Sequence, residues 1–182
     1  MTSAGRDPAR RLRILHCLRA PVGGLFRHVR DLAEAQSNRG HFVGIVCAAG
    51  DAGRLSEAQL SDIERHLALG LHRIAMPRRP GLQDVSAWRN VRDLCRRLDV
   101  NIVHGHGAKG GAYARLAAWS LRRQARAPGA IYTPHGGSLH YAPRSPEGLL
   151  YMGLERMMAR ATRAIIFESA FAQDRFADRI GL

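Results

Sequence analysis

The sequence predicts an α/β domain: a Rossmann-like, doubly wound parallel sheet of about six strands, in the order 3-2-1-4-5-6, with helices on both faces. Short apolar runs of strand length alternate along the chain with stretches in which apolar residues recur at helical spacing. This alternation is typical of parallel strands joined by helices, and right-handed crossovers favour that strand order. The length of 182 residues, 46% of them hydrophobic, suits one domain with a substantial core.

Each element follows from its own apolar pattern. Short apolar runs bounded by turn residues predict strands at 11–18, 41–49, 71–77, 100–106, 130–137 and 162–169. Apolar residues three or four positions apart predict helices at 25–40, 51–70, 84–99, 111–123, 146–161 and 170–182. The helix at 51–70 is the ambiguous one, because only Leu60, Ile63 and Leu67 mark its apolar face.

The ends of the chain and its cysteines indicate where the protein works. Residues 1–11 have the composition of a disordered N-terminal segment, and residues 12–182 form the predicted domain. No segment has the pattern of a signal peptide or the roughly 18 apolar residues of a membrane span, so we expect a cytoplasmic protein. Cys17, Cys47 and Cys95 are widely spaced, which predicts buried free thiols and no structural zinc site.

The chain is strongly basic, with a formal net charge of +13, and Lys109 is its only lysine. Such a field favours polyanionic partners. Aromatic residues make up only 6% of the chain and no nucleic-acid-reading motif is present. We therefore expect an anionic membrane surface or a phosphorylated substrate as the partner, and no nucleic acid.

Three turns rich in glycine and histidine follow the first, fourth and fifth predicted strands: "APVGGLFRH" (20–28), "HGHGAKGG" (104–111) and "TPHGGS" (133–138). Ligands of doubly wound sheets bind at the carboxyl ends of the strands, so these turns should line one cleft. Within them, the alternation with Ile102 favours His104 as a packed strand residue. We expect His28 to be a surface or helix-capping group.

Gly105, Gly107 and Gly110 spell G-x-G-x-x-G, the pattern of a dinucleotide-binding turn. That turn belongs after the first strand and needs an acidic residue about 20 positions further on. Here the match follows the fourth strand, and the sequence 125–132 contains no acid. An NAD(P)-dependent oxidoreductase therefore remains only a less favoured alternative.

The motifs "VGGLFRHVRDLA", "NIVHGHGAKGGAYARLAA", "IYTPHGG" and "LERMMARATRAIIFESAFAQDRF" occur in this order. Together they resemble the N-terminal domain of retaining glycosyltransferases of family 4, group 1, over about residues 12–182. The resemblance implies a GT-B architecture, in which two Rossmann-like domains face each other across a cleft. It also implies that the nucleotide-sugar site lies in a C-terminal domain absent from this chain, so that the chain is the acceptor-binding half of a hexosyltransferase and inactive alone.

The resemblance further implies a UDP- or GDP-sugar donor, no permanently bound cofactor and no essential metal. The acceptor would be a glycan, lipid-linked or phosphorylated molecule of cell-envelope or polysaccharide biosynthesis, reached from the cytoplasm or the inner membrane face. The roles it assigns are catalytic positioning for His135; donor diphosphate for Gly23 and Gly24; acceptor binding for His106, Lys109, Gly110 and Gly136; and the cleft rim for Glu168 and Ser169. A stand-alone sugar-phosphate or membrane-surface binding module remains an alternative.

Overall fold

The computed structural model describes residues 11–50, 54–136 and 146–180, with the backbone alone at 146–151. The segment predicted to be disordered falls, except for its last residue, outside the described residues. The elements are β1 (Arg13–Leu18), α1 (Gly23–Asn38), β2 (Phe42–Ala48), α2 (Arg54–Glu64), β3 (Gly70–Ile74), α3 (Gln83–Arg97), β4 (Ile102–His106), α4 (Gly107–Leu121), β5 (Gly129–Thr133), α5 (Pro146–Ala159), β6 (Ala164–Ile165) and α6 (Ala170–Ile180).

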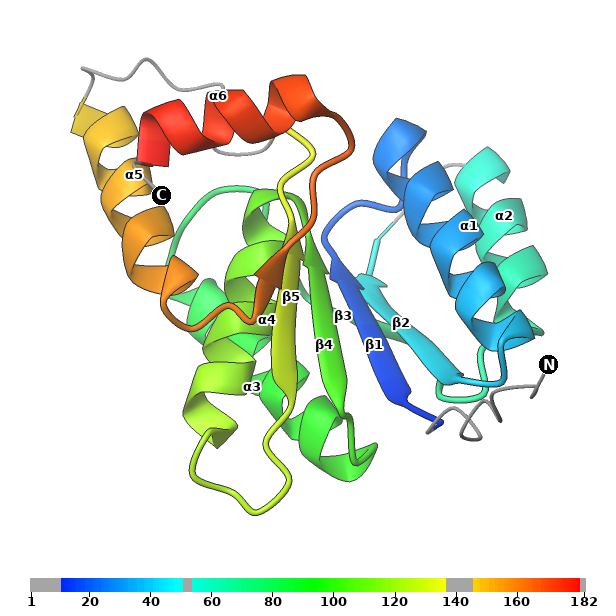
Figure 1. Cartoon of the computed structure of the whole chain (residues 1–182). Helices are drawn as coiled ribbons and strands as arrows, with labels where there is room; N and C mark the ends of the chain where they lie inside the picture. Colours follow the sequence, from blue (N-terminus) through cyan, green and yellow to red (C-terminus); the bar gives the residue numbers. More distant parts are fainter. Residues whose placement is uncertain (1–10, 51–53, 137–145, 181–182) are drawn as a thin grey trace, which may run out of the picture.

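All neighbouring strands are parallel, in the order β3-β2-β1-β4-β5-β6, which confirms the predicted topology (Figure 1). The ambiguous segment before β3 is helical, as α2. The sixth strand is wrong in extent, since only Ala164 and Ile165 pair with β5 instead of the predicted 162–169. β6 is an edge strand with β5 as its one neighbour, and only Ile131 and Tyr132 of β5 pair with it.

Two apolar cores lie on the two faces of the sheet. Alternate side chains of a strand point to opposite faces, so β1 contributes Leu18 to one core and Leu15 and Cys17 to the other. The first core is completed by α1 and α2, and the second by α3 and α4. A smaller cluster joins Tyr132 of β5 to α6. The strands are thus buried by helices on both faces, as a parallel sheet requires.

Helix α4 begins at Gly107, four residues before the predicted start, and its glycines bring it close against the sheet. A Cβ atom on Gly110 would lie 2.3 Å from the carbonyl oxygen of Cys17, and one on Gly111 would lie 2.2 Å from the Tyr132 ring. At Gly105 the added atom would lie 2.5 Å from the Cα of Gly111. The glycine pattern is therefore a close helix–sheet contact, and its members at 105 and 110 offer no open backbone to a phosphate.

A buried ion pair joins α4, α5 and β5. Nη1 of Arg115 lies 2.7 Å from Oε2 of Glu155, and both side chains are almost fully buried. The Arg115 guanidinium also covers the Tyr132 ring at 3.9 Å, and the Tyr132 hydroxyl donates to Glu155 at 3.2 Å. A buried charge needs such partners, so α5 is held at one rotation and height on α4.

Candidate functional site at the carboxyl ends of the strands

Five histidines gather at the carboxyl ends of the central strands, although they are far apart in the sequence. We call them the histidine cluster: His16, His28, His104, His106 and His135. His16 lies on β1 beside His104 on β4, and His106 is two residues further along β4 on the same face. His135 follows β5, and His28 reaches the group from the second turn of α1. The three glycine–histidine turns thus meet, as predicted.

A continuous chain of hydrogen-bonding groups runs through the histidine cluster. Nε2 of His16 lies 2.8 Å from Oε1 of Gln36, and Nδ1 of His16 lies 3.0 Å from Nε2 of His106. The other nitrogen of His106, Nδ1, lies 3.1 Å from Nε2 of His135. Nδ1 of His135 lies 2.8 Å from Oε1 of Glu168, which ends the chain at the surface.

The backbone conformation at the end of β5 orients the His135 side chain toward Glu168. His135 and Gly136 are both left-handed, with φ of 49° and 73°. This conformation is unfavourable for a residue with a side chain and is found where the surrounding structure imposes it. Here the cluster contacts hold the ring, whose side chain is only 6% exposed, whereas Glu168 is 42% exposed. His135 is therefore a fixed group and Glu168 its partner at the rim.

Burial keeps the inner histidines neutral at neutral pH. It lowers the pKa of His16 to about 4 and that of His104 to about 2, and it lowers the pKa of His106 well below the usual value. His104 donates or accepts at Thr133 Oγ1 over 2.9 Å, so the prediction of a packed strand residue is confirmed. Burial also lowers the pKa of His135, while the Glu168 carboxylate opposes that shift.

The beginning of α1 is open beside the cluster. Gly23 has a φ of 64°, and a Cβ atom on Gly23 or Gly24 would meet no atom within 4 Å. The first turn contains no acidic residue and no side chain caps it. Free backbone N–H groups at such an end favour an anion. Ser169 lies at the start of α6, where its hydroxyl accepts from the Ala172 N–H at 3.2 Å, so it caps that helix.

Lys109 and Gly110 lie apart from the histidine cluster, because they belong to the first turn of α4. Nζ of Lys109 donates to Oδ1 of Asp84 at 2.6 Å and to the carbonyl of Arg79 at 3.1 Å. Tyr113 also donates to Asp84. Burial alone would raise the pKa of Asp84, but these hydrogen bonds lower it. Gly110 faces the backbone of β1 and is enclosed there.

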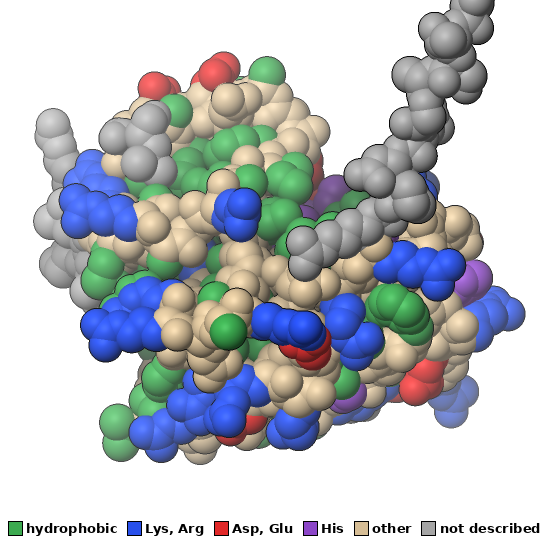
Figure 2. Space-filling view, turned by 60° about the horizontal axis from the view of Figure 1, so that its bottom comes forward, with side chains coloured by type: hydrophobic (Ala, Val, Ile, Leu, Met, Phe, Trp, Pro, Cys, Tyr) green, Lys and Arg blue, Asp and Glu red, His purple; other side chains and the backbone are tan. Residues whose placement is uncertain are grey.

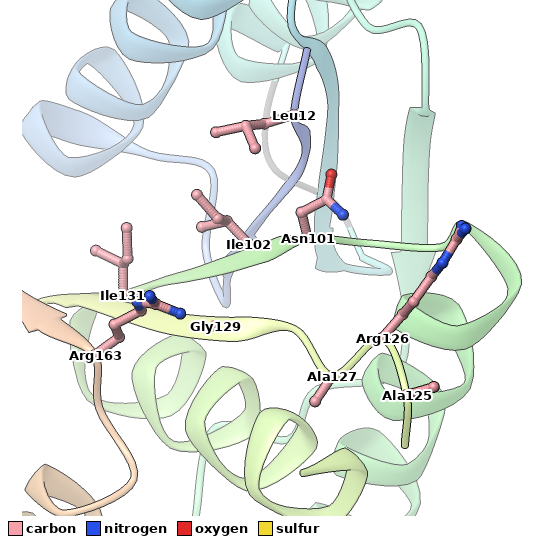
Figure 3. A pocket seen from close by; sticks show the side chains of 9 residues that line it. All are labelled: Leu12, Asn101, Ile102, Ala125, Arg126, Ala127, Gly129, Ile131 and Arg163. Atoms are coloured by element: carbon pink, nitrogen blue, oxygen red, sulfur yellow. The ribbon is translucent and has the colours of Figure 1, made fainter. Parts of the chain in front are cut away.

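Two cavities bear on where a ligand could lie. One of about 440 Å³ lies between α3, α4 and α5 and is lined by Lys109, Asp84, Tyr113 and apolar side chains such as Trp88. The other, of about 560 Å³, opens at the amino ends of β4 and β5, around Asn101, Gly129 and Arg163 (Figure 3). Ligands of parallel sheets bind at the carboxyl ends of the strands. The second cavity lies at the opposite edge of the sheet, away from the expected ligand site.

Sequence reasoning missed three members of the site. His16 and Gln36 have no motif of their own, because a strand histidine and a helix glutamine are ordinary core-edge residues. His28 was expected at the surface or as a helix cap; its side chain is 35% exposed, but its ring centre also lies 5.2 Å from that of His135, so it is a member of the cluster as well. The spacing Gly23 to His28 within one helix start was the signal that could have found it.

The surface carries the excess of basic residues that the composition predicts. Figure 2 shows a face on which Lys and Arg side chains are spread between apolar patches, with few acidic side chains. Among the helices of the described residues, none combines the length and the hydropathy needed to cross a membrane.

Comparisons with known proteins bear on the family of this chain. The model of "Glycosyltransferase Family 4" matches residues 22–182. A protein of Bacillus subtilis (strain 168), described as "Putative glycosyltransferase EpsD", is 34% identical over 88 residues, which are 46% of this chain and 22% of that protein.

Solved structures share the fold at low identity. A glycosyltransferase from Rickettsia africae ESF-5 matches with a TM-score of 0.71 at 14% identity, over 95% of this chain and 41% of its own. MurG of Acinetobacter baumannii matches with 0.58 at 14% identity, over 88% and 42%. A UDP-N-acetylglucosamine 2-epimerase matches with 0.60 at 13% identity, over 93% and 45%. The chain therefore spans less than half of the length of each of these structures.

Proposed function

Because the chain belongs to glycosyltransferase family 4, we propose that it is the acceptor-side half of a retaining hexosyltransferase that uses a nucleotide sugar. The observation that carries this proposal is His135, which is fixed by Glu168 and the histidine cluster at the carboxyl ends of the strands. Nucleotide-sugar binding belongs, in this proposal, to a second domain outside residues 1–182. Residues 1–182 alone are then inactive, and the full-length protein works in cell-envelope or polysaccharide assembly.

The open start of α1 supports the role assigned to Gly23 and Gly24. The donor diphosphate approaches these glycines when the second domain closes, because no side chain obstructs them and the helix end attracts negative charge. A UDP- or GDP-sugar carries such a diphosphate. The basic surface adds a favourable long-range field for the same anion.

His135 acts by positioning and not as a nucleophile. Its lowered pKa makes the imidazole neutral at neutral pH. Nδ1 faces Glu168 and Nε2 faces His106, so both ring nitrogens have partners within the protein and the ring keeps one orientation beside the transferred sugar. A fixed ring restricts the orientation of the sugar as an oxocarbenium-like transition state forms and the diphosphate departs. This chemistry requires no metal.

The acceptor side is supported by the cavity beside Lys109. Arg78 and the Asp84-paired Lys109 lie there among apolar side chains, which suits a molecule that carries both a phosphate and an apolar portion, such as a lipid-linked or phosphorylated sugar. Gly136 continues the left-handed turn from His135, next to the loop that leads to α5. His106 contributes through His135, because it is itself buried.

The test is His135→Ala in the full-length protein, with His66→Ala as the matched histidine variant outside the cluster. Turnover of nucleotide sugar should fall by about 100-fold or more for His135→Ala, as is usual when a group that positions the reacting atoms is lost. The midpoint of thermal unfolding should change little. Equal turnover in the two variants would reject the role of His135.

A binding titration of residues 1–182 separates this proposal from its rivals. UDP and GDP should bind weakly, because the donor site lies in the other domain. Tight binding of NAD or NADP would instead favour an oxidoreductase. Tight binding of a sugar phosphate, with no further domain needed for it, would favour a stand-alone binding module.

A further inference from the structure

Three members of the histidine cluster have the arrangement of a transition-metal site. One ring nitrogen from each of His28, His106 and His135 lies within 4.8 Å of the others. The closest pair, Nδ1 of His106 and Nε2 of His135, is 3.1 Å apart. Two imidazole ligands of one tetrahedral zinc ion lie about 3.3 Å apart, as bond lengths of about 2.0–2.1 Å require. We propose that these three histidines bind a divalent transition-metal ion of the zinc class.

The hydrogen-bond chain gives an independent reason to propose a metal site. It leaves no hydrogen to share between the facing nitrogens of His106 and His135. Glu168 can only accept, so Nδ1 of His135 carries a hydrogen, and Nε2 of the neutral ring is a bare lone pair. At the other end, Oε1 of Gln36 accepts from Nε2 of His16, so Nδ1 of His16 accepts from Nε2–H of His106.

It follows that Nδ1 of His106 is also a bare lone pair. Two lone pairs then face each other across 3.1 Å. A cation bound to both nitrogens, off the line that joins them, removes the conflict and leaves every other hydrogen bond of the chain intact. Without a cation, the conflict is removed by a turned-over Gln36 amide that donates to His16, or by a proton on Nε2 of His135, whose charge Glu168 would balance.

His28 supplies the third ligand. Its Nε2 is buried and has no hydrogen-bond partner within the part of the chain that the structure describes. The ring centre of His28 lies 5.2 Å from that of His135 and 6.0 Å from that of His106. The side chain is 35% exposed, and its other nitrogen, Nδ1, lies 4.0 Å from Oε1 of Glu168. The partly exposed side chain of His28 therefore places this trio at the surface, where an ion can reach it.

The surroundings of the ligands suit a metal site. A ligating histidine usually donates its other N–H to a carboxylate or another acceptor, which fixes the ring. Here His135 donates to Glu168 at 2.8 Å, and His106 donates to His16 at 3.0 Å. Neutral imidazole ligands favour Zn²⁺, Ni²⁺ or Cu²⁺ over Mg²⁺ and Ca²⁺. A second trio, formed by His16, His104 and His106, lies inside the sheet and has no such opening.

The ion would bind Nε2 of His135, the residue to which the proposed function assigns the positioning of the sugar. Bound metal should therefore interfere with sugar positioning at His135, a consequence that rests on the proposed function. The metal site itself does not rest on it, because binding can be measured on this chain without any turnover.

The experiment is a calorimetric titration of chelator-treated, dialysed protein with Zn²⁺, with Co²⁺ absorption as a second readout. We expect one Zn²⁺ per chain and the visible bands of tetrahedral Co²⁺, with no heat from Mg²⁺. His28→Ala and His135→Ala should abolish the binding, and Glu168→Gln should weaken it about 10–100-fold. His66→Ala should bind as the parent does.

Gln36→Glu makes the test sharper, because a carboxylate beside His16 can only accept a hydrogen bond. Nε2 of His16 must then carry a hydrogen, which leaves Nδ1 of His106 as the bare lone pair that a metal ion requires. This variant should bind Zn²⁺ at least as tightly as the parent. Circular dichroism establishes that each variant is folded before it is scored. Equal Zn²⁺ binding by the parent and by a folded His28→Ala, or none by the parent, would overturn the proposal.

Discussion

Gly110 is one of the glycines that allow α4 to approach the sheet closely. Any side chain at Gly110 meets the backbone of β1, since a Cβ atom would lie 2.3 Å from the Cys17 carbonyl oxygen. Backbone cannot move aside as a flexible side chain can. A residue without a side chain at this position therefore permits the observed close approach of α4 to β1.

We predict that Gly110→Ala lowers the free energy of unfolding by at least about 1–3 kcal/mol, the usual cost of overpacking. The loss should exceed the gain of about 1 kcal/mol that alanine brings to a helix interior. Urea denaturation measures it. Gly24→Ala is the matched variant, because its Cβ meets open space, and it should be neutral or stabilising by at most about 1 kcal/mol. Equal losses at both positions would contradict the packing account.

The attachment of α5 to α4 depends on one buried ion pair. We predict that Glu155→Ala lowers the free energy of unfolding by about 3–5 kcal/mol, because it leaves the Arg115 guanidinium buried without its carboxylate. A double variant, Arg115→Met with Glu155→Leu, should recover much of that loss. Thermal and urea unfolding of the two variants give the comparison.

An exposed pair provides the control for this prediction. Arg27 lies 3.9 Å from Asp31 on α1, and both side chains are largely exposed. Arg27→Ala should cost less than about 1 kcal/mol, as exposed pairs usually do. If the single Glu155 variant were no less stable than this one, the buried pair would not be what fixes α5.

At the scale of the whole molecule, the three thiols report on global unfolding. Cys17 on β1, Cys47 on β2 and Cys95 on α3 are at most 2% exposed, which confirms the predicted burial. Burial raises the pKa of Cys47 to about 11 and that of Cys95 to about 12, so neither is a thiolate near pH 8.

We predict that a thiol reagent at pH 8 modifies all three cysteines in one slow phase whose rate increases with urea. The physical reason is that each thiol becomes accessible only when the whole sheet opens. The absorbance of the chromophore that the reagent releases measures the reaction rate and the number of reacting thiols. A fast phase that accounts for one thiol would show a local opening instead.

The sequence predicts the topology of this molecule better than it predicts the functional site. Alternating strands and helices leave few topologies once crossovers are right-handed, so the strand order could be predicted. The meeting of three glycine–histidine turns followed from that order. The role of Lys109 did not follow from it, because the helix start at Gly107 places this residue on α4, facing Asp84 of α3.

The pairing of individual nitrogens lies beyond sequence reasoning. His16 and Gln36 are 20 residues apart and belong to different elements, and only their packing brings their side chains to 2.8 Å. The left-handed conformation of His135 could not be predicted either, because no local sequence signal indicates it for a histidine. Such contacts depend on the exact height of α1 and α4 on the sheet, which the apolar pattern specifies only to within a turn.

The two-residue length of β6 has a consequence for how the site moves. His106 ends a central strand that is paired on both sides, whereas Glu168 follows an edge strand held by two register pairs. Local opening begins where the fewest backbone hydrogen bonds must break. The Glu168 carboxylate can therefore move away while the rings of the histidine cluster stay in place, so the hydrogen bond at the rim can open without a rearrangement of the sheet.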